Sequence, residues 1–262
     1  MESQIKETNE IFADNLLRLA LDVGEGMLKN GAEINRVEDT IERICKAYGA
    51  NHVEVFSIIS VIHAAIRMPD GTYSSQMRRV KTTSTDFGVL EELNALSRNI
   101  CKNQPTLEEF DEMIHDIKKR KTYPFWMLII ASAMATGAFA LFFGGSVKDA
   151  LVAALIGSLV AVIDKYASKR LNSMAKTLVS SFVAAMLAVL STRIGLGDNS
   201  GIIIIGVIMI LVPGISFVTA LRDLLCGDLL TGSLKTVQAC LGALMIAFGY
   251  LFAMTLLGGG AA

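Results

Sequence analysis

The sequence has few of the residues that build metal sites, disulfide frameworks or rigid loops. It contains 4 cysteines, 3 histidines and 4 prolines among 262 residues. The cysteines form no C-x-x-C pair and the histidines are dispersed, so neither metal-ligand spacing nor a disulfide framework is indicated. We therefore expect no metal ion and no cofactor, and we interpret the cysteines as small buried hydrophobic side chains.

Motifs for nucleotide binding and nucleophilic catalysis are also absent. The sequence contains no Walker phosphate loop, no GxGxxG and no GxSxG, so we expect neither an ATPase nor another enzyme. The net charge is −1, which indicates no basic surface for nucleic acid. The opening residues MESQIKETNE are charged and no apolar run follows directly, so no cleavable signal peptide is expected.

Apolar sequence is abundant and is concentrated in one half of the chain. Residues 1–123 hold 16 of the 24 Lys and Arg and 20 of the 25 Asp and Glu, and residues 124–262 hold the rest. The first half is long enough for one small domain, and the second for several membrane-crossing helices. We predict a soluble N-terminal α+β domain over 1–121 and a transmembrane α-helical bundle over 122–262.

The C-terminal half contains five uncharged runs. Because a helix rises 1.5 Å per residue, about 20 residues cross the hydrocarbon core of a bilayer. Three runs reach that length, and the two shorter ones have basic residues at their ends that can reach the membrane surface. We predict about five spans, with four as the alternative. The runs cover residues 122–147, 150–163, 177–192, 199–221 and 236–262.

Positive charge is distributed unevenly between the loops that join these runs. The segments before the first run, between the second and third, and between the fourth and fifth carry ten Lys and Arg. The loops on the other side carry only Lys148 and Arg193. By the positive-inside rule, the N-terminal domain is therefore expected in the cytoplasm.

Small residues recur four positions apart within the runs, as in Ala133/Gly137, Ala153/Gly157 and Ala184/Ala188. Such spacing lets helix backbones approach closely in lipid, which is typical of a packed bundle rather than of a single anchor. Polar side chains within the runs either form hydrogen bonds between helices or line a pathway.

The fourth run is interrupted by Pro213 and Gly214 and is followed by Arg222, Asp223 and Asp228. Proline removes a backbone donor, and a broken helix in lipid needs protein or a water-filled cavity to satisfy the freed carbonyls. Secondary transporters bind their substrates at such breaks. Charges in apolar surroundings are costly unless they are paired or functional. The alternative is that these charges lie in an interfacial loop or at helix ends.

The N-terminal half combines helical and strand patterns. Apolar periodicity predicts two helices, then two or three antiparallel strands between residues 52 and 80, then two more helices, which is the order of a small α+β domain. The third helix is capped near Thr85 or Asp86, and Thr106 with Glu109 forms a capping box for the fourth. The helices are predicted over 10–29, 33–48, 86–103 and 106–120.

Two long patterns, GAEINRVEDTIERICKAYG at 31–49 and LVPGISFVTALRDLLCGDLLTG at 211–232, resemble the threonine/serine exporter (ThrE) family. More closely, the chain resembles the larger subunit of the two-gene form, whose relatives include bacterial succinate exporters. The resemblance covers nearly the whole chain. It marks Arg36, Val37, Glu38, Pro213, Gly214, Arg222, Asp223, Gly227 and Asp228.

The resemblance implies proton-driven export of small hydrophilic metabolites across the bacterial inner membrane. It leaves open whether these are amino acids such as threonine and serine or dicarboxylates such as succinate. Full-length members carry a second membrane block, so the resemblance implies a small membrane subunit of the same family as a partner. Homo-oligomeric contacts and membrane lipid are also expected.

These patterns suggest roles for individual residues. Arg222 is the expected partner of a substrate carboxylate, because its planar guanidinium can bind one bidentately. The expected pathway residues are Pro213, Gly214, Ser216, Thr219 and Arg222; the expected proton-relay residues are Asp164, Asp223 and Asp228. The soluble-domain motif consists of Glu33, Arg36 and Glu38, which are also spaced as on any solvated helix. The alternative function is a membrane-tethered hydrolase-like or regulatory protein whose soluble domain acts on or senses a small molecule.

Overall fold

The computed structural model describes residues 2–81, 84–119, 123–167 and 170–257, with side chains from residue 7 onward. The chain divides into two compact units. The first comprises Met1–Lys121 and Thr219–Lys235, and the second comprises Thr122–Val218 and Thr236–Ala262. Several predicted features lie outside the described residues: the boundary at 121/122, part of the basic segments, and the chain end at 258–262.

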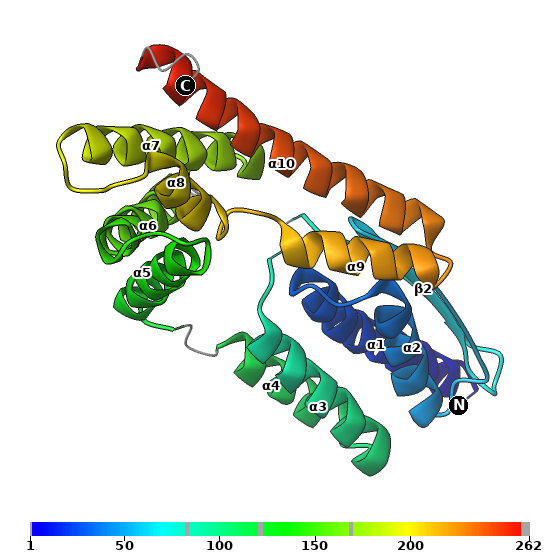
Figure 1. Cartoon of the computed structure of the whole chain (residues 1–262). Coiled ribbons are helices and arrows are strands. Elements are labelled where there is room, and N and C mark those ends of the chain that lie inside the picture. Colours follow the sequence, from blue (N-terminus) through cyan, green and yellow to red (C-terminus); the bar gives the residue numbers. More distant parts are fainter. Residues whose placement is uncertain (1, 82–83, 120–122, 168–169, 258–262) are drawn as a thin grey trace. The chain divides into compact units, whose positions relative to one another are not determined.

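The first unit has the predicted order of two helices, three strands and two helices (Figure 1). The first helix begins at Glu2 rather than near residue 10, because the polar residues before residue 10 include good helix formers but show no apolar stripe that would reveal them. The elements are α1 (Glu2–Lys29), α2 (Ile34–Ala47), β1 (His52–Ile58), β2 (Val61–Arg67), β3 (Tyr73–Arg79), α3 (Phe87–Asn103) and α4 (Leu107–Lys118).

The three strands form an antiparallel sheet in the order β1-β2-β3, in which His63 pairs with both Phe56 and Met77. Helix α1 packs against β2 and β3, while α2 packs against β1. The core between these layers is fully buried at Leu16 and Ile41. Alternating apolar residues on strands and periodic ones on helices therefore meet in one core, as the patterns predicted.

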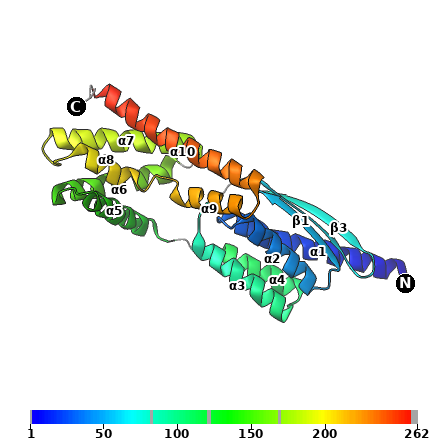
Figure 2. The same cartoon turned by 45° about the vertical axis from the view of Figure 1, so that its right-hand side comes forward.

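Helices α3 and α4 lie side by side in both views (Figures 1 and 2). Asp86 caps α3 by accepting hydrogen bonds from the backbone N–H groups of Gly88 and Val89. Thr106 and Glu109 form the capping box of α4. Both predicted caps are confirmed, and they fix where the two helices begin.

The second unit is helical. Two helices belong to both units: α9 enters the first unit at Thr219, and α10 leaves it after Lys235. The predicted interruption of the fourth run is confirmed, because α8 and α9 are separate helices. The elements are α5 (Phe125–Phe142), α6 (Val147–Ala167), α7 (Ser173–Arg193), α8 (Ser200–Ile208), α9 (Gly214–Leu225) and α10 (Leu229–Leu256).

Three of these helices, α5, α7 and α10, are long and apolar enough to cross a membrane. Helices α8 and α9 have 9 and 12 residues, so neither reaches the roughly 20 residues that a span requires. The count of five spans is not confirmed by this finding and stays a prediction.

The packing of the second unit differs from that of a water-soluble domain. Its buried residues are mostly small, including Ala140, Ala153 and Ala188, while large apolar side chains such as Phe142 and Leu155 are exposed. A side chain on Gly157 would collide with Thr136 of α5. Small residues inside and large apolar residues outside are what helices packed in lipid require.

Candidate functional site

Charged residues from the two sequence patterns meet in the first unit. Arg222 Nη1 of α9 lies 2.7 Å from Glu33 Oε1, and Arg36 Nε lies 3.9 Å from Glu33 Oε2. The Glu33 side chain is only 19% exposed, whereas that of Arg222 is 56% exposed. The two patterns therefore contribute to one ion-pair cluster, although they are far apart in the sequence.

The start of α2 makes Glu33 available for this contact. Gly31 has a φ of +93°, in the left-handed region that favours glycine, and turns the chain after α1. Glu33 is the N-cap residue of α2, but its side chain makes no capping hydrogen bond. Ile34 and Val37 are buried in the core and so fix the rotation of α2 about its axis. Both Glu33 carboxylate oxygens are left for the guanidinium groups.

Glu38, further along α2, connects the helix to β1. The backbone N–H and the hydroxyl of Ser57 both donate to Glu38 Oε1, at 2.6 and 3.0 Å. Burial raises the pKa of Glu38 above its usual 4.5 against the lowering effect of the Ser57 hydrogen bonds, and the charge of Asp228 raises it further. Glu38 thus has a weak electrostatic coupling to the segment that carries Asp228.

Asp223 is buried and Asp228 is half-buried, and the charges of both interact with Lys235. Asp223 is 2% exposed, and its Oδ2 lies 2.6 Å from Lys235 Nζ. Asp228 Oδ2 is buried and has no hydrogen-bond partner among the described residues. Burial raises the pKa of Asp228, the Asp223 carboxylate raises it further, and Lys235 opposes both. Asp228 therefore holds a proton more readily than an ordinary aspartate.

Two glycines shape the turn between α9 and α10. Gly227 has a φ of +98°, which a residue with a side chain rarely adopts. A Cβ atom on Gly232 would lie 2.8 Å from the backbone nitrogen of Leu224, so the two helices approach closely here. This close approach brings Asp228 back toward Asp223, whose carbonyl accepts from the Asp228 N–H at 2.9 Å.

The helix break lies at the predicted position. Helix α8 ends at Ile208, α9 begins at Gly214, and Pro213 between them has no N–H. Among the described residues, no backbone N–H donates to the carbonyls of Met209, Ile210 or Leu211. Further along α9, Ser216 is exposed and Thr219 is half-buried. The break therefore leaves backbone acceptors that the helices do not satisfy.

A pocket of about 680 Å³ in the second unit, here called the break pocket, includes this stretch. Its lining contains Ile210 and Leu211 from the break, Ser132 from α5, and Asp164 near the end of α6. Asp164 accepts hydrogen bonds from Lys176 Nζ at 3.1 Å and from Ser180 Oγ at 3.0 Å. A mainly apolar pocket with a few polar groups is the usual form of a small-molecule site.

The three predicted relay residues therefore fall into two places. Asp223 and Asp228 belong to the first unit, and Asp164 to the second. Arg222 contacts a protein carboxylate, Glu33, in this structure. Its role toward a substrate carboxylate stays a prediction, as do the relay roles.

Sequence reasoning missed two partners, Ser57 and Lys235, because nothing in a serine on a strand or a lysine on a helix indicates which carboxylate it will contact. Asp149 accepts hydrogen bonds from the backbone N–H groups of Asp198 and Asn199, at 2.8 and 3.0 Å, and from Ser146. In the structure, Asp149 connects two loops.

The residues that the structure describes contain no group of three or more His, Cys, Asp or Glu that could hold a metal ion. The interpretation of the cysteines as buried side chains is confirmed for Cys45 but is wrong for Cys226 and Cys240, which are exposed.

Comparison with known proteins gives relatives of two kinds. The chain is 24% identical to "Probable threonine/serine exporter" of Mycobacterium tuberculosis over 94% of its own length and 47% of the relative. It is 24% identical to "Threonine/serine exporter" of Corynebacterium glutamicum, over 86% and 48% of the two chains. It therefore spans about half the length of these relatives.

Relatives of the second kind match this chain over nearly the whole length of both proteins. "Probable succinate transporter subunit YjjP" of Klebsiella aerogenes is 22% identical over 92% of this chain and 93% of the relative. No solved structure matches the chain. The model of the family described as "Putative threonine/serine exporter" matches residues 18–257, a range that includes α2, the break pocket and the segment 219–235. The ion-pair cluster and the helix break thus lie within the matched range, and the chain belongs to the threonine/serine exporter (ThrE) family.

Proposed function

We propose that the chain is a subunit of a proton-coupled exporter that moves small hydrophilic metabolites out of the cytoplasm across a bacterial inner membrane. The candidate substrates are amino acids of the threonine and serine type and dicarboxylates such as succinate. These compounds appear in the names of the relatives.

The break pocket is the observation that carries this proposal. Backbone carbonyls at 209–211, which accept from no backbone N–H of the described residues, and the Asp164 carboxylate give a largely apolar region the polar groups that a hydrophilic substrate needs. Non-helical backbone at membrane depth is tolerated where it lines a cavity, and transporters use such backbone to bind substrates and ions. A simple membrane anchor would need neither feature.

Proton coupling requires a carboxyl group that changes its protonation state during the cycle. Asp164 lies at the break pocket, where its bonds to Lys176 and Ser180 would change on protonation. Asp228 has a raised pKa and an unpaired buried oxygen. Both properties support the roles predicted for Asp164 and Asp228 in a proton relay.

A partner subunit is supported by the lengths of the relatives. The chain matches nearly the whole of a relative named as a transporter subunit, but only half of the proteins named as exporters. We therefore propose that a small membrane subunit of the same family completes the transporter, with further contacts between copies of this chain. The basic loops support a cytoplasmic N-terminal domain.

Export assays in cells test this proposal. Labelled threonine, serine and succinate are followed in cells that express the chain with or without the small subunit. We expect Asp164→Asn to remove most of the export that the pair of subunits provides. Asp198→Asn, which changes a half-exposed carboxylate of the second unit outside the break pocket, should retain it.

Full export by Asp164→Asn with unchanged pH dependence would remove Asp164 from the relay. If the chain with its partner moved none of the three substrates, while the purified chain bound a small molecule through its soluble domain, the regulatory alternative would replace transport.

A further inference from the structure

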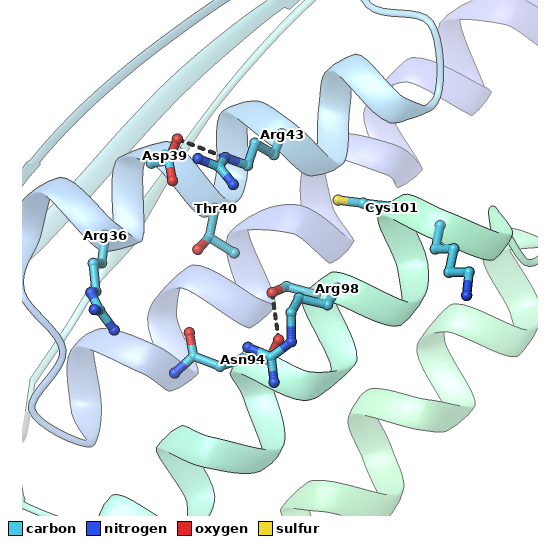
Figure 3. Close-up of a pocket in the computed structure, with 9 residues that line it drawn as sticks. Arg36, Asp39, Thr40, Arg43, Asn94, Arg98 and Cys101 are labelled. Atoms are coloured by element: carbon cyan, nitrogen blue, oxygen red, sulfur yellow. Dashed lines mark hydrogen bonds and ion pairs between the residues drawn. The ribbon is translucent and has the colours of Figure 1, made fainter.

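A second pocket lies in the first unit, between α2 and α3, and has a volume of about 550 Å³. Figure 3 shows its lining side chains, which come from both helices. This α2–α3 pocket shares no lining residue with the break pocket. Its volume is typical of sites for small metabolites. The lining residues are Arg36, Asp39, Thr40, Arg43, Asn94, Ser97, Arg98, Cys101 and Lys102.

The lining is strongly basic. Four cationic side chains surround the pocket, against the single carboxylate of Asp39. That carboxylate is already engaged, because Arg43 Nε lies 2.8 Å from Asp39 Oδ1 (Figure 3). The excess of positive charge at the pocket is therefore not neutralised by its own walls.

The remaining cations are weakly paired or unpaired. Arg98 and Lys102, one turn apart on α3, form no ion pair within the part of the chain that the structure describes. Arg36 is 3.9 Å from Glu33, whose other oxygen is bound more closely by Arg222. Like charges held near one another repel unless an anion lies between them.

The floor of the pocket adds hydrogen-bonding groups. The Thr40 side chain is buried, and within the described residues its hydroxyl has no hydrogen-bond partner. Asn94 and Ser97 donate to carbonyls of their own helix, those of Leu90 and Asn94. Thr40 is thus a free donor beneath the cations, where an anion's oxygen would lie.

We infer that the α2–α3 pocket binds a small metabolite that carries at least two anionic groups, carboxylate or phosphate. Arginine guanidiniums bind such groups through parallel hydrogen bonds, and three of the four cations here are arginines. The placement of cations on two facing helices fits an anion that bridges α2 and α3. The inference does not depend on the proposed transport function, because binding at this pocket is measured without flux.

The test uses the purified full chain in neutral detergent. Pyrophosphate and citrate are titrated by calorimetry against the wild type, against Arg98→Gln/Lys102→Gln, and against Arg67→Gln/Arg79→Gln. The last variant removes two exposed cations from β2 and β3, outside the pocket. We expect saturable binding to the wild type, affinity weakened at least about tenfold in the pocket variant, and unchanged affinity in the control. Equal unfolding temperatures without ligand show that each variant is folded.

A phospholipid headgroup offers the same phosphate chemistry, so a second arm separates the two sources. The titration is repeated in nanodiscs of phosphatidylcholine with or without phosphatidylglycerol. If the anionic lipid lowers the affinity for pyrophosphate in the wild type but not in the pocket variant, the pocket binds a headgroup, and otherwise it binds a free metabolite. Absence of saturable binding in every condition, or equal affinities for the pocket and control variants, would overturn the inference.

Discussion

The guanidinium of Arg222 on α9 lies 2.7 Å from the Glu33 carboxylate at the start of α2. Through this contact, a residue of the second sequence pattern is paired with a residue of the first within the first unit. A change in the position of α9 would therefore alter its ion pair with the start of α2. The contact gives α2 a physical means of responding to the transport cycle that we propose.

Removing the Glu33 charge should loosen the segment 219–225. Because the ion pair is half-exposed, we expect Glu33→Gln to lower the free energy of unfolding by only about 0.5–1 kcal/mol. Hydrogen exchange at residues 219–225 should become faster. Combining Glu33→Arg with Arg222→Glu should restore slow exchange, whereas Arg36→Gln, which removes the longer 3.9 Å contact, should have a smaller effect. If neither Glu33→Arg alone nor Arg222→Glu alone changed the exchange rate, the contact would not hold the segment.

The pair Asp223–Lys235 should matter far more for stability. Asp223 is 2% exposed and Lys235 16% exposed, so Lys235→Met leaves a buried carboxylate without its partner. We expect a loss of about 3–5 kcal/mol, and recovery of most of it in Asp223→Leu/Lys235→Met. Lys148→Met, which breaks an exposed 3.5 Å pair with Asp198, should cost no more than about 1 kcal/mol. Thermal unfolding of the full chain in detergent measures the stability of these three variants. If Asp223→Leu/Lys235→Met were no more stable than Lys235→Met, the loss would not come from an unpaired buried carboxylate.

Much of the first unit could be predicted from its sequence, because the information is local. The apolar residues Ile34, Val37 and Ile41 recur at helical spacing and are all buried in the structure. Asp86 and Thr106 cap the helices that follow them, through contacts within three residues. Spacing within one turn or one strand was sufficient for these features.

The pairings between distant elements could not be predicted in the same way. The carboxylates of Glu33 and Asp223 each have a basic partner, but the sequence offers more than one basic residue for either role. The α2–α3 pocket was missed because Arg36 and Arg98 lie on helices whose charged faces look like ordinary solvated faces. Which faces meet is decided by tertiary packing rather than by local spacing.

Helix contacts in the second unit should fail when a small residue is enlarged. A Cβ atom on Gly206 of α8 would lie 2.9 Å from the backbone nitrogen of Ala140 and 3.0 Å from its Cβ, so α5 and α8 must separate. We expect Gly206→Ala to destabilise the protein by about 1–3 kcal/mol. Gly242→Ala on α10 meets only the Pro213 ring at 3.6 Å and should be neutral or stabilising, by up to about 1 kcal/mol. Equal unfolding temperatures for the two variants would show that the α5–α8 contact is not close in solution.

The raised pKa of Glu38 predicts how stability depends on pH. Its pKa in the folded protein is raised above the usual 4.5, chiefly by burial, so ionising Glu38 costs more in the folded chain than in the unfolded one. Its contribution to stability is therefore fully present below about pH 4.5 and is lost as the pH rises through the folded-state pKa. Asp228, whose pKa is raised from 3.8 by burial, acts in the same direction.

Glu38→Gln keeps an oxygen that can accept both hydrogen bonds from Ser57 but removes the ionisation. We expect the unfolding temperature of this variant, relative to the wild type, to rise between pH 4 and pH 7. Asp228→Asn should show the same trend, and Asp116→Asn, at an exposed position on α4, serves as the control for losing one charge. A difference between Glu38→Gln and wild type that stays constant or falls over this range would show that Glu38 is ionised as easily in the folded protein as in the unfolded chain.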